Sequence, residues 1–394
     1  MKYTTTVADY LTWRGDVPFA VDPFNEVDNL VLCIISYINF RRFPELLTRN
    51  PREAVLLRDI SARLTAEDEQ LGLSQLDYIP VVQQAAQTER FNEVRMFAFE
   101  DRSDEETQMQ FAAVSFLLPD KSVFVAFRGT DTSLVGWKED FNMSYLEAVP
   151  AQVRAAEYTA EIMRLCRLRK VRIGGHSKGG NLSVYAAVKA PAAVQDRIVR
   201  VYNNDGPGFA KPLVGTPEHT RVADRILTVV PQSSVVGQLL EHEQNVEIVR
   251  SDAEGMLQHD GFSWQVVGDH FIHLDDFSRE GKVIDETLES WEGSLSPKQR
   301  EAFADALYTV LTASGAKTLS DLNGDKLKSA VTMLKTYSNL DRETRQLLSG
   351  SLRALVGSYA KNVADDVQKN DLEPLRRKLE RQRKKAEKRG AKKK

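Results

Sequence analysis

Residues 171–190 read VRIGGHSKGGNLSVYAAVKA and combine a short apolar strand, a glycine-rich turn and a helical run that stops at Pro191. The turn fits the pattern Gly-x-Ser-x-Gly and consists of Gly175, His176, Ser177, Lys178 and Gly179. Between a strand and a helix, this pattern is typical of a nucleophile elbow, whose sharp bend lifts a serine hydroxyl above the sheet edge. We therefore predict that Ser177 is a catalytic nucleophile; the alternative is an accidental glycine-rich turn.

Strand and helix patterns extend on both sides of this segment. Strand candidates lie at 111–118, 123–127, 171–173, 198–202, 226–230 and 246–249. The first two are separated by a short turn sequence and predict a hairpin. The later strands alternate with helical or loop segments, which favours a mostly parallel sheet covered on both faces. Together with the elbow, this pattern predicts an α/β protein with an α/β-hydrolase fold.

The chain divides into four regions by composition. Residues 1–90 are mostly helical in pattern and are expected to pack on the hydrolase core, which occupies 91–277. Residues 278–370 repeat apolar positions every three or four residues and predict a helical extension. Residues 371–394 lack aromatic residues and are dominated by Lys, Arg and Glu, so we expect a solvated helix or a disordered tail.

Charge is unevenly distributed along the chain. The formal net charge is -3, yet Arg376–Lys394 carries 12 Lys and Arg residues against two Glu residues. This basic tail could contact an anionic membrane surface, whereas the lack of interleaved aromatic residues argues against specific nucleic-acid binding. The chain has two cysteines, Cys33 and Cys166, and no apolar run of signal-peptide or membrane-span length. We therefore expect buried free thiols and a cytoplasmic protein, which the basic tail could bring to the membrane surface.

A serine nucleophile needs a neighbouring base. Five histidines follow Ser177, and in this fold class the order is serine, acid, histidine. His259 is favoured because it lies in a polar loop directly after the last strand candidate; the alternative is an ordinary surface residue. The other histidines are His219 and His242, expected on helices with structural roles, and His270 and His273, which lie near Asp269. No third ligand cluster supports a metal there, so we predict neither a metal nor a cofactor.

Asp205 is the predicted acid, because it ends the strand that begins at Ile198. It could instead only cap the turn, with Asp252 or Asp260 as substitutes. An oxyanion hole needs two preorganised donors. One is expected to be the backbone N–H of Lys178. The second is expected from the N–H and hydroxyl of Thr130, with Arg128 anchoring that loop by an ion pair.

Several motifs resemble known families. The segment Val125-Ala-Phe-Arg-Gly-Thr130, followed by Trp137 and Asp140, resembles the block that precedes the lid of class 3 (fungal-type) lipases, as the elbow resembles their Gly-His-Ser-Leu-Gly. The segments 10–15, 23–28, 204–209 and 258–260 resemble the Mbeg-like family of unknown function, whose members are predicted hydrolases. The similarity spans roughly Met1 to Phe277.

The resemblance implies a lipase-like fold, with Ser177 as nucleophile, His259 as base and Thr130 with the Lys178 amide as oxyanion donors. It also implies a lid near 132–138. The expected activity is serine ester hydrolysis of an acyl ester or lipid. Lys178, where these lipases often have Leu, suggests a more polar or anionic substrate.

One departure from the lipase pattern concerns the acid. Class 3 lipases place it just after the strand that matches 226–230, whereas residues 230–237 here read VPQSSVVG and contain no carboxylate. Either Asp205 has taken the role from the preceding strand or the triad is incomplete. An incomplete triad would favour the alternative function, a catalytically inactive scaffold or regulator that binds a protein or lipid partner.

Overall fold

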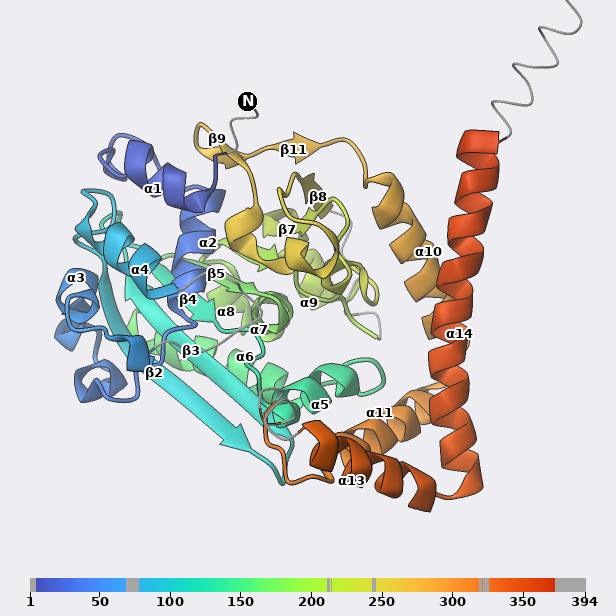
Figure 1. The fold of residues 1–394 in the computed structure, drawn as a ribbon. Coiled ribbons are helices and arrows are strands. Elements are labelled where there is room, and N and C mark those ends of the chain that lie inside the picture. The colour runs from blue at the N-terminus through green and yellow to red at the C-terminus, as the bar shows by residue number, and fades with distance from the viewer. Residues whose placement is uncertain are drawn as a thin grey trace, which may run out of the picture.

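A mixed β-sheet forms the centre of the molecule. The computed structural model describes residues 5–68, 78–210, 213, 215–242, 246–318, 321 and 326–372. Within that part of the chain, nine strands form the central sheet in the order β1-β2-β3-β4-β5-β6-β7-β8-β11 (Figure 1). They are β1 Val55–Leu56, β2 Arg95–Asp104, β3 Met109–Leu117, β4 Val123–Phe127, β5 Val171–His176, β6 Ile198–Asn204, β7 Ile226–Pro231, β8 Val246–Val249 and β11 His273–Leu274. β9 Val266–Val267 pairs separately with β10 His270–Phe271.

The five strands β4 to β8 are parallel, and the strands outside them pair antiparallel. The predicted α/β architecture is therefore confirmed, with a parallel centre and antiparallel edges. Longer helices are α1 Val7–Arg14, α2 Glu26–Ile35, α4 Tyr78–Gln87, α5 Leu134–Asn142, α6 Pro150–Leu165 and α7 Lys178–Lys189, and shorter ones are α3 Leu57–Ser61, α8 Ala192–Gln195 and α9 Pro217–Thr220.

Alternating side chains of the strands supply two separate cores. In β4, Phe124 and Ala126 join the core beneath α1, α2 and α4, whereas Val123, Val125 and Phe127 join the core beneath α6 and α7. This follows from the period of two along a strand, which sends neighbouring side chains to opposite faces. The N-terminal helices are thus one of the two layers that cover the sheet.

Two local features differ from the sequence prediction. The apolar run from Asp28 to Phe40 predicts a helix capped by Asp28 or Asn29, whereas α2 begins at Glu26 and is capped by Asn25, whose side chain accepts from the N–H groups of Val27 and Asp28. Strand β2 was not predicted. It combines a buried stretch with a charged, partly exposed end and is interrupted by a bulge at Ala98, which has φ 56°, so its sequence lacks the regular alternation of a strand.

The C-terminal region adds the helices α10 Arg279–Gly293, α11 Pro297–Thr312, α13 Lys326–Asn339 and α14 Arg342–Val367. A third, small core joins α11 and α14 to Phe141 of α5, and α14 runs along one side of the molecule (Figure 1). Among the described helices, none combines the length and the apolar character that crossing a bilayer requires. The basic tail, apart from its first two residues, lies outside the described residues.

Candidate active site

The elbow forms where β5 ends and α7 begins. Ser177 lies between them with φ 59° and ψ −136°, a left-handed backbone that few non-glycine residues adopt. Gly175 and Gly179 are necessarily small, because a Cβ on Gly175 would lie 2.1 Å from the Gly179 backbone. The N–H of Ser177 donates to the carbonyl of Asn204 in the adjacent strand β6 (2.9 Å). The strain therefore sits in a bend that close packing holds from both sides.

His259 and Asp205 meet although 54 residues separate them. The Nδ1 atom of His259 lies 2.6 Å from Oδ2 of Asp205, and both side chains are buried. Asp205 follows β6, and His259 ends a short 3₁₀ turn, Gly255–His259. A carboxylate at this distance accepts the Nδ1 proton and leaves Nε2 of His259 as the basic nitrogen.

The loop after β7 takes part in this arrangement without supplying an acid. The Ser234 hydroxyl donates to Oδ1 of Asp205 (2.6 Å). A Cβ on Gly237 would lie 2.1 Å from that same oxygen. Burial raises the pKa of Asp205, and the hydrogen bonds from His259 and Ser234 oppose that rise. The position where class 3 lipases were expected to carry the acid thus holds a hydroxyl that orients Asp205.

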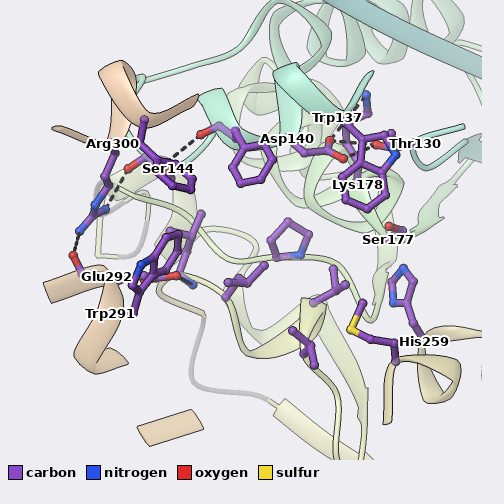
Figure 2. Close-up of a pocket in the computed structure, with 18 of the residues that line it drawn as sticks. Thr130, Trp137, Asp140, Ser144, Ser177, Lys178, His259, Trp291, Glu292 and Arg300 are labelled. Atoms are coloured by element: carbon purple, nitrogen blue, oxygen red, sulfur yellow. Dashed lines mark hydrogen bonds and ion pairs between the residues drawn. The ribbon is translucent and has the colours of Figure 1, made fainter. Parts of the chain in front are cut away.

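Ser177 and His259 line one cavity of about 260 Å³. Figure 2 shows the Ser177 hydroxyl and the His259 ring facing each other on the same wall. Within the described chain, no hydrogen bond joins the two side chains. In sites without substrate such bonds are often long and tighten only in the reacting complex.

The rest of the cavity wall is mainly apolar. Helix α5 contributes Trp137 and Phe141, and the C-terminal helices contribute Trp291 and Phe303. Further apolar lining residues are Pro207, Val235, Val236, Leu239, Leu240, Met256 and Leu295. At the far end, Arg300 donates to the carbonyls of Ser144 (2.9 Å) and Glu292 (2.6 Å) (Figure 2). Helix α5 spans most of the segment where a lid was expected, and α11 packs on it.

The loop with Thr130 approaches the elbow closely. A Cβ on Gly129 would lie 2.9 Å from the Cβ of Ser177, so only glycine fits there. Arg128 lies 3.3 Å from Asp101 and from Asp131, which confirms its predicted ion-pair role. The Thr130 hydroxyl behaves otherwise than expected, because it donates to the carboxylate of Asp140 (2.7 Å). The single hydroxyl proton of Thr130 is therefore used in this bond. For the predicted oxyanion hole, the donor that remains on Thr130 is its backbone N–H.

Asp140 reaches the cavity beside Thr130 (Figure 2). Burial raises the pKa of its carboxyl to about 6, while the nearby Lys178 and the Thr130 hydrogen bond oppose the rise. The distance from the Lys178 ammonium to the Asp140 carboxylate is 3.8 Å. A carboxyl with this pKa changes charge close to neutral pH.

The ammonium group of Lys178 is buried and paired within the protein, which removes the basis for our interpretation of it. It is 1% exposed, and its ammonium donates to Gln110 Oε1 (2.6 Å), to the Gln110 carbonyl (2.9 Å) and to Glu139 (3.0 Å). The charge is neutralised inside the protein, so Lys178 gives no support for an anionic substrate. The sequence suggested no such pairing, because Gln110 and Glu139 lie 68 and 39 residues away.

We expect Lys178→Met to lower the free energy of unfolding by about 3–5 kcal/mol, because it leaves Glu139 buried without its cation. Equilibrium urea unfolding measures this loss. The double variant Lys178→Met/Glu139→Gln is the control, and its loss should be smaller than the sum of the two single losses. Strictly additive losses would contradict a coupled buried pair.

The other four histidines downstream of Ser177 are not among the residues that line its cavity. His219 is buried on α9, as expected of a structural residue, whereas His242 follows an isolated bridge residue and does not lie on a helix. The two rings of His270 and His273 stack with centroids 6.3 Å apart. His273 contacts Glu26 (2.9 Å) and Glu247 (2.8 Å).

His176 gives the stability a defined pH dependence. Burial and the neighbouring His259 lower the pKa of His176 from 6.5 to about 3. Between these two pKa values the unfolded chain binds more protons than the folded protein. The contribution of His176 to the free energy of unfolding is therefore fully present above pH 6.5 and is lost as the pH falls toward 3. From pH 7.5 to 5, wild type should lose about 2 kcal/mol more than His176→Gln in urea unfolding. Equal losses in both proteins would show that His176 charges freely in the fold.

The chain is similar to several solved structures at low sequence identity. Solved structures similar to this chain include a Rhizomucor miehei lipase propeptide complex (16% identity, 41% of this chain and 58% of that chain, TM-score 0.29). Lip2 lipase from Yarrowia lipolytica (12%, 55% and 81%, 0.33) and a structure described as fungal lipases (11%, 69% and 90%, 0.37) are also similar.

The chain spans 58% of the length of the Rhizomucor miehei complex. No curated protein matches the sequence. A family model described as Mbeg1-like matches residues 85–309, which is more than half of the chain and confirms the resemblance drawn from the motifs. The chain therefore belongs to the Mbeg1-like family.

Proposed function

We propose that this protein is a serine hydrolase that cleaves acyl esters. The observation that carries the proposal is the buried pair of His259 and Asp205, 2.6 Å apart, on a cavity that Ser177 also lines. A nucleophile, a base and an acid that orients the base are the parts that acyl transfer needs. The proposed reaction needs no metal or cofactor.

The reaction would proceed in two steps. The Ser177 oxygen attacks the acyl carbonyl carbon while Nε2 of His259 takes the hydroxyl proton, and the same proton is then given to the departing alkoxide. The backbone N–H groups of Thr130 and Lys178 would hold the oxyanion. Water, deprotonated by His259, then attacks the acyl-enzyme and releases the acid and Ser177.

The cavity favours an apolar acyl group. Its wall is formed largely by aromatic and aliphatic side chains, among them Trp137, Leu239 and Trp291. Such a wall gains free energy from burying a hydrocarbon chain. A lipid or another ester with an aliphatic acyl group is therefore the substrate class that we propose.

The inactive-scaffold alternative rested on the missing carboxylate after 226–230. It loses that support because Asp205 reaches His259 from the preceding strand. Labelling with a fluorophosphonate probe tests the proposal without a known substrate. We expect one adduct, mapped to Ser177 in the native protein and absent after unfolding. A native protein whose Ser177 stays unlabelled would favour the scaffold.

We also propose that the basic tail brings the protein to anionic membranes in the cytoplasm. Each Lys or Arg near such a surface contributes about 1 kcal/mol, and Arg376–Lys394 contains 12 of them. Deleting residues 371–394 should abolish sedimentation of the protein with phosphatidylserine vesicles at low salt. Neither the full-length nor the truncated protein should sediment with vesicles of neutral lipid. Unchanged sedimentation of the truncated protein would refute this role.

A further inference from the structure

Tyr37 is a buried residue, outside the predicted triad, whose hydroxyl lies between two parts of the candidate site. The hydroxyl oxygen is 3.0 Å from Nδ1 of His176. On its other side it contacts the loop of Thr130, since a Cβ on Gly129 would lie 2.2 Å from it. Tyr37 follows α2 in the N-terminal region, 139 residues before the elbow.

The His176 ring continues this contact to the predicted base. Its Nε2 lies 2.7 Å from the backbone carbonyl oxygen of His259. The two imidazole rings also pack together, with centroids 4.6 Å apart and planes at 34°. His176 therefore touches both the backbone and the ring of His259.

The chemistry and the distances of these partners assign the protons. The Tyr37 hydroxyl also lies 3.4 Å from the His176 carbonyl oxygen, but its contact with Nδ1 is the shorter of the two at 3.0 Å. A carbonyl oxygen only accepts, so Nε2 of His176 must carry the hydrogen. Burial keeps His176 neutral near pH 7, since its pKa falls to about 3. Its Nδ1 is then a bare acceptor, and the Tyr37 hydroxyl donates to it. The hydrogen bonds thus run in one direction, from Tyr37 through His176 to His259.

We infer that Tyr37 and His176 are positioning residues, which hold the His259 backbone and the 129–130 loop at a fixed separation across Ser177. His259 ends a 3₁₀ turn of five residues. Besides the Asp205 bond, the backbone beside it is held by Trp264, which donates to the Gln258 carbonyl (2.9 Å). The His176 bond acts on the base residue itself, and so limits how its ring can turn toward Ser177. This inference rests on the proposed function.

The variant Tyr37→Phe tests the inference by removing only the hydroxyl. The matched control is Tyr158→Phe, which removes another buried hydroxyl, bonded to the Ala98 carbonyl (2.7 Å) and to Ser115, in the opposite core. With a p-nitrophenyl ester, Tyr37→Phe should lower kcat about tenfold at unchanged KM, less than the ~100-fold that a misplacement of about 1 Å costs. Tyr158→Phe should leave both constants unchanged. Equal kinetics for the two variants would overturn the inference.

A second pair of variants separates positioning from packing. His176→Gln keeps an N–H donor near the His259 carbonyl, whereas His176→Leu keeps only apolar volume. We expect the glutamine variant to retain at least about ten times the kcat of the leucine variant, which is ~1.4 kcal/mol in the barrier. An equal loss of kcat in both variants would assign His176 a packing role. It would overturn the inference that the hydrogen bonds from Tyr37 through His176 position His259.

The tautomer of His176 can be measured without turnover. Long-range ¹H–¹⁵N spectra of wild type should show a protonated Nε2 and a bare Nδ1 for His176, and Tyr37→Phe should shift the Nδ1 signal. A proton on Nδ1 of His176 in wild type would overturn the inferred hydrogen bonds from Tyr37 through His176 to His259, even if the protein hydrolyses the ester. Failure of the fluorophosphonate to label wild-type Ser177 would instead contradict the proposed function alone, so the two failures are distinguishable.

Discussion

Replacing Ser177 by alanine should reduce kcat for a short-chain p-nitrophenyl ester by a factor on the order of 10⁶, to the rate that substrate binding and the oxyanion donors sustain by themselves. The reason is that the alanine methyl group can neither attack the acyl carbonyl nor give a proton to His259. Alanine keeps the backbone at φ 59° equally strained, so the melting temperature should stay nearly constant. Ester-hydrolysis kinetics and thermal unfolding measure the two effects.

Ser183→Ala is the matched control for this experiment. Ser183 lies on the same helix as the elbow, is buried, and its hydroxyl donates to the Gly179 carbonyl (2.8 Å) away from the cavity. Its loss should leave kcat within about twofold of wild type, although it costs about 1 kcal/mol of stability. If Ser177→Ala hydrolysed the ester as fast as Ser183→Ala, hydrolysis at this site would be excluded.

Asp205→Asn should lower kcat about 10⁴-fold, because the amide forces the wrong tautomer on His259. The Ser234 hydroxyl donates to Oδ1 of Asp205, so the amide oxygen of asparagine should keep that position. The NH₂ group then faces Nδ1 of His259, which must become an acceptor. Its proton moves to Nε2, the nitrogen that would take the proton of Ser177. Steady-state kinetics measure the loss.

The double variant Asp205→Asn/Ser234→Ala tests that explanation. Without the Ser234 donor the amide can rotate and offer its oxygen to His259, so part of the lost rate should return. Ser234→Ala alone serves as the control and should cost much less than Asp205→Asn. A double variant slower than Asp205→Asn, or an Asp205→Asn protein within tenfold of wild type, would contradict the role of Asp205 as the orienting acid.

The elbow could be predicted from sequence because its signal is local. Strand β5, the bend at Ser177 and helix α7 are continuous in the chain, and glycine at 175 and 179 is required wherever such a bend occurs. The parallel sheet also followed from the alternation of strands and helices. Strand β2 did not, since its alternation breaks at a bulge beside Ala98. The backbone of Ala98 is held there by distant residues, because its N–H donates to the Thr48 carbonyl (2.8 Å) and its carbonyl accepts from the Tyr158 hydroxyl (2.7 Å).

Side-chain direction limited the prediction of the site. Three acids, Asp205, Asp252 and Asp260, were compatible with the sequence, and only the fold places one of them 2.6 Å from His259. Lys178 suggested an anionic substrate until the structure showed its ammonium buried against Glu139. In both cases the deciding partner lies at least 39 residues away in the sequence. Local periodicity and short motifs cannot predict a contact over that separation.

By itself, then, the sequence determined the bend that carries Ser177 and the class of fold around it, because backbone geometry and hydrophobic period depend on neighbouring residues. Tertiary packing decided which acid orients His259, where the Lys178 charge goes and how Tyr37 reaches His176. Those contacts join segments from different layers of the molecule. These contacts form only once the sheet has brought the ends of its strands together. The polar groups buried there then form hydrogen bonds with one another, because buried polar groups need partners.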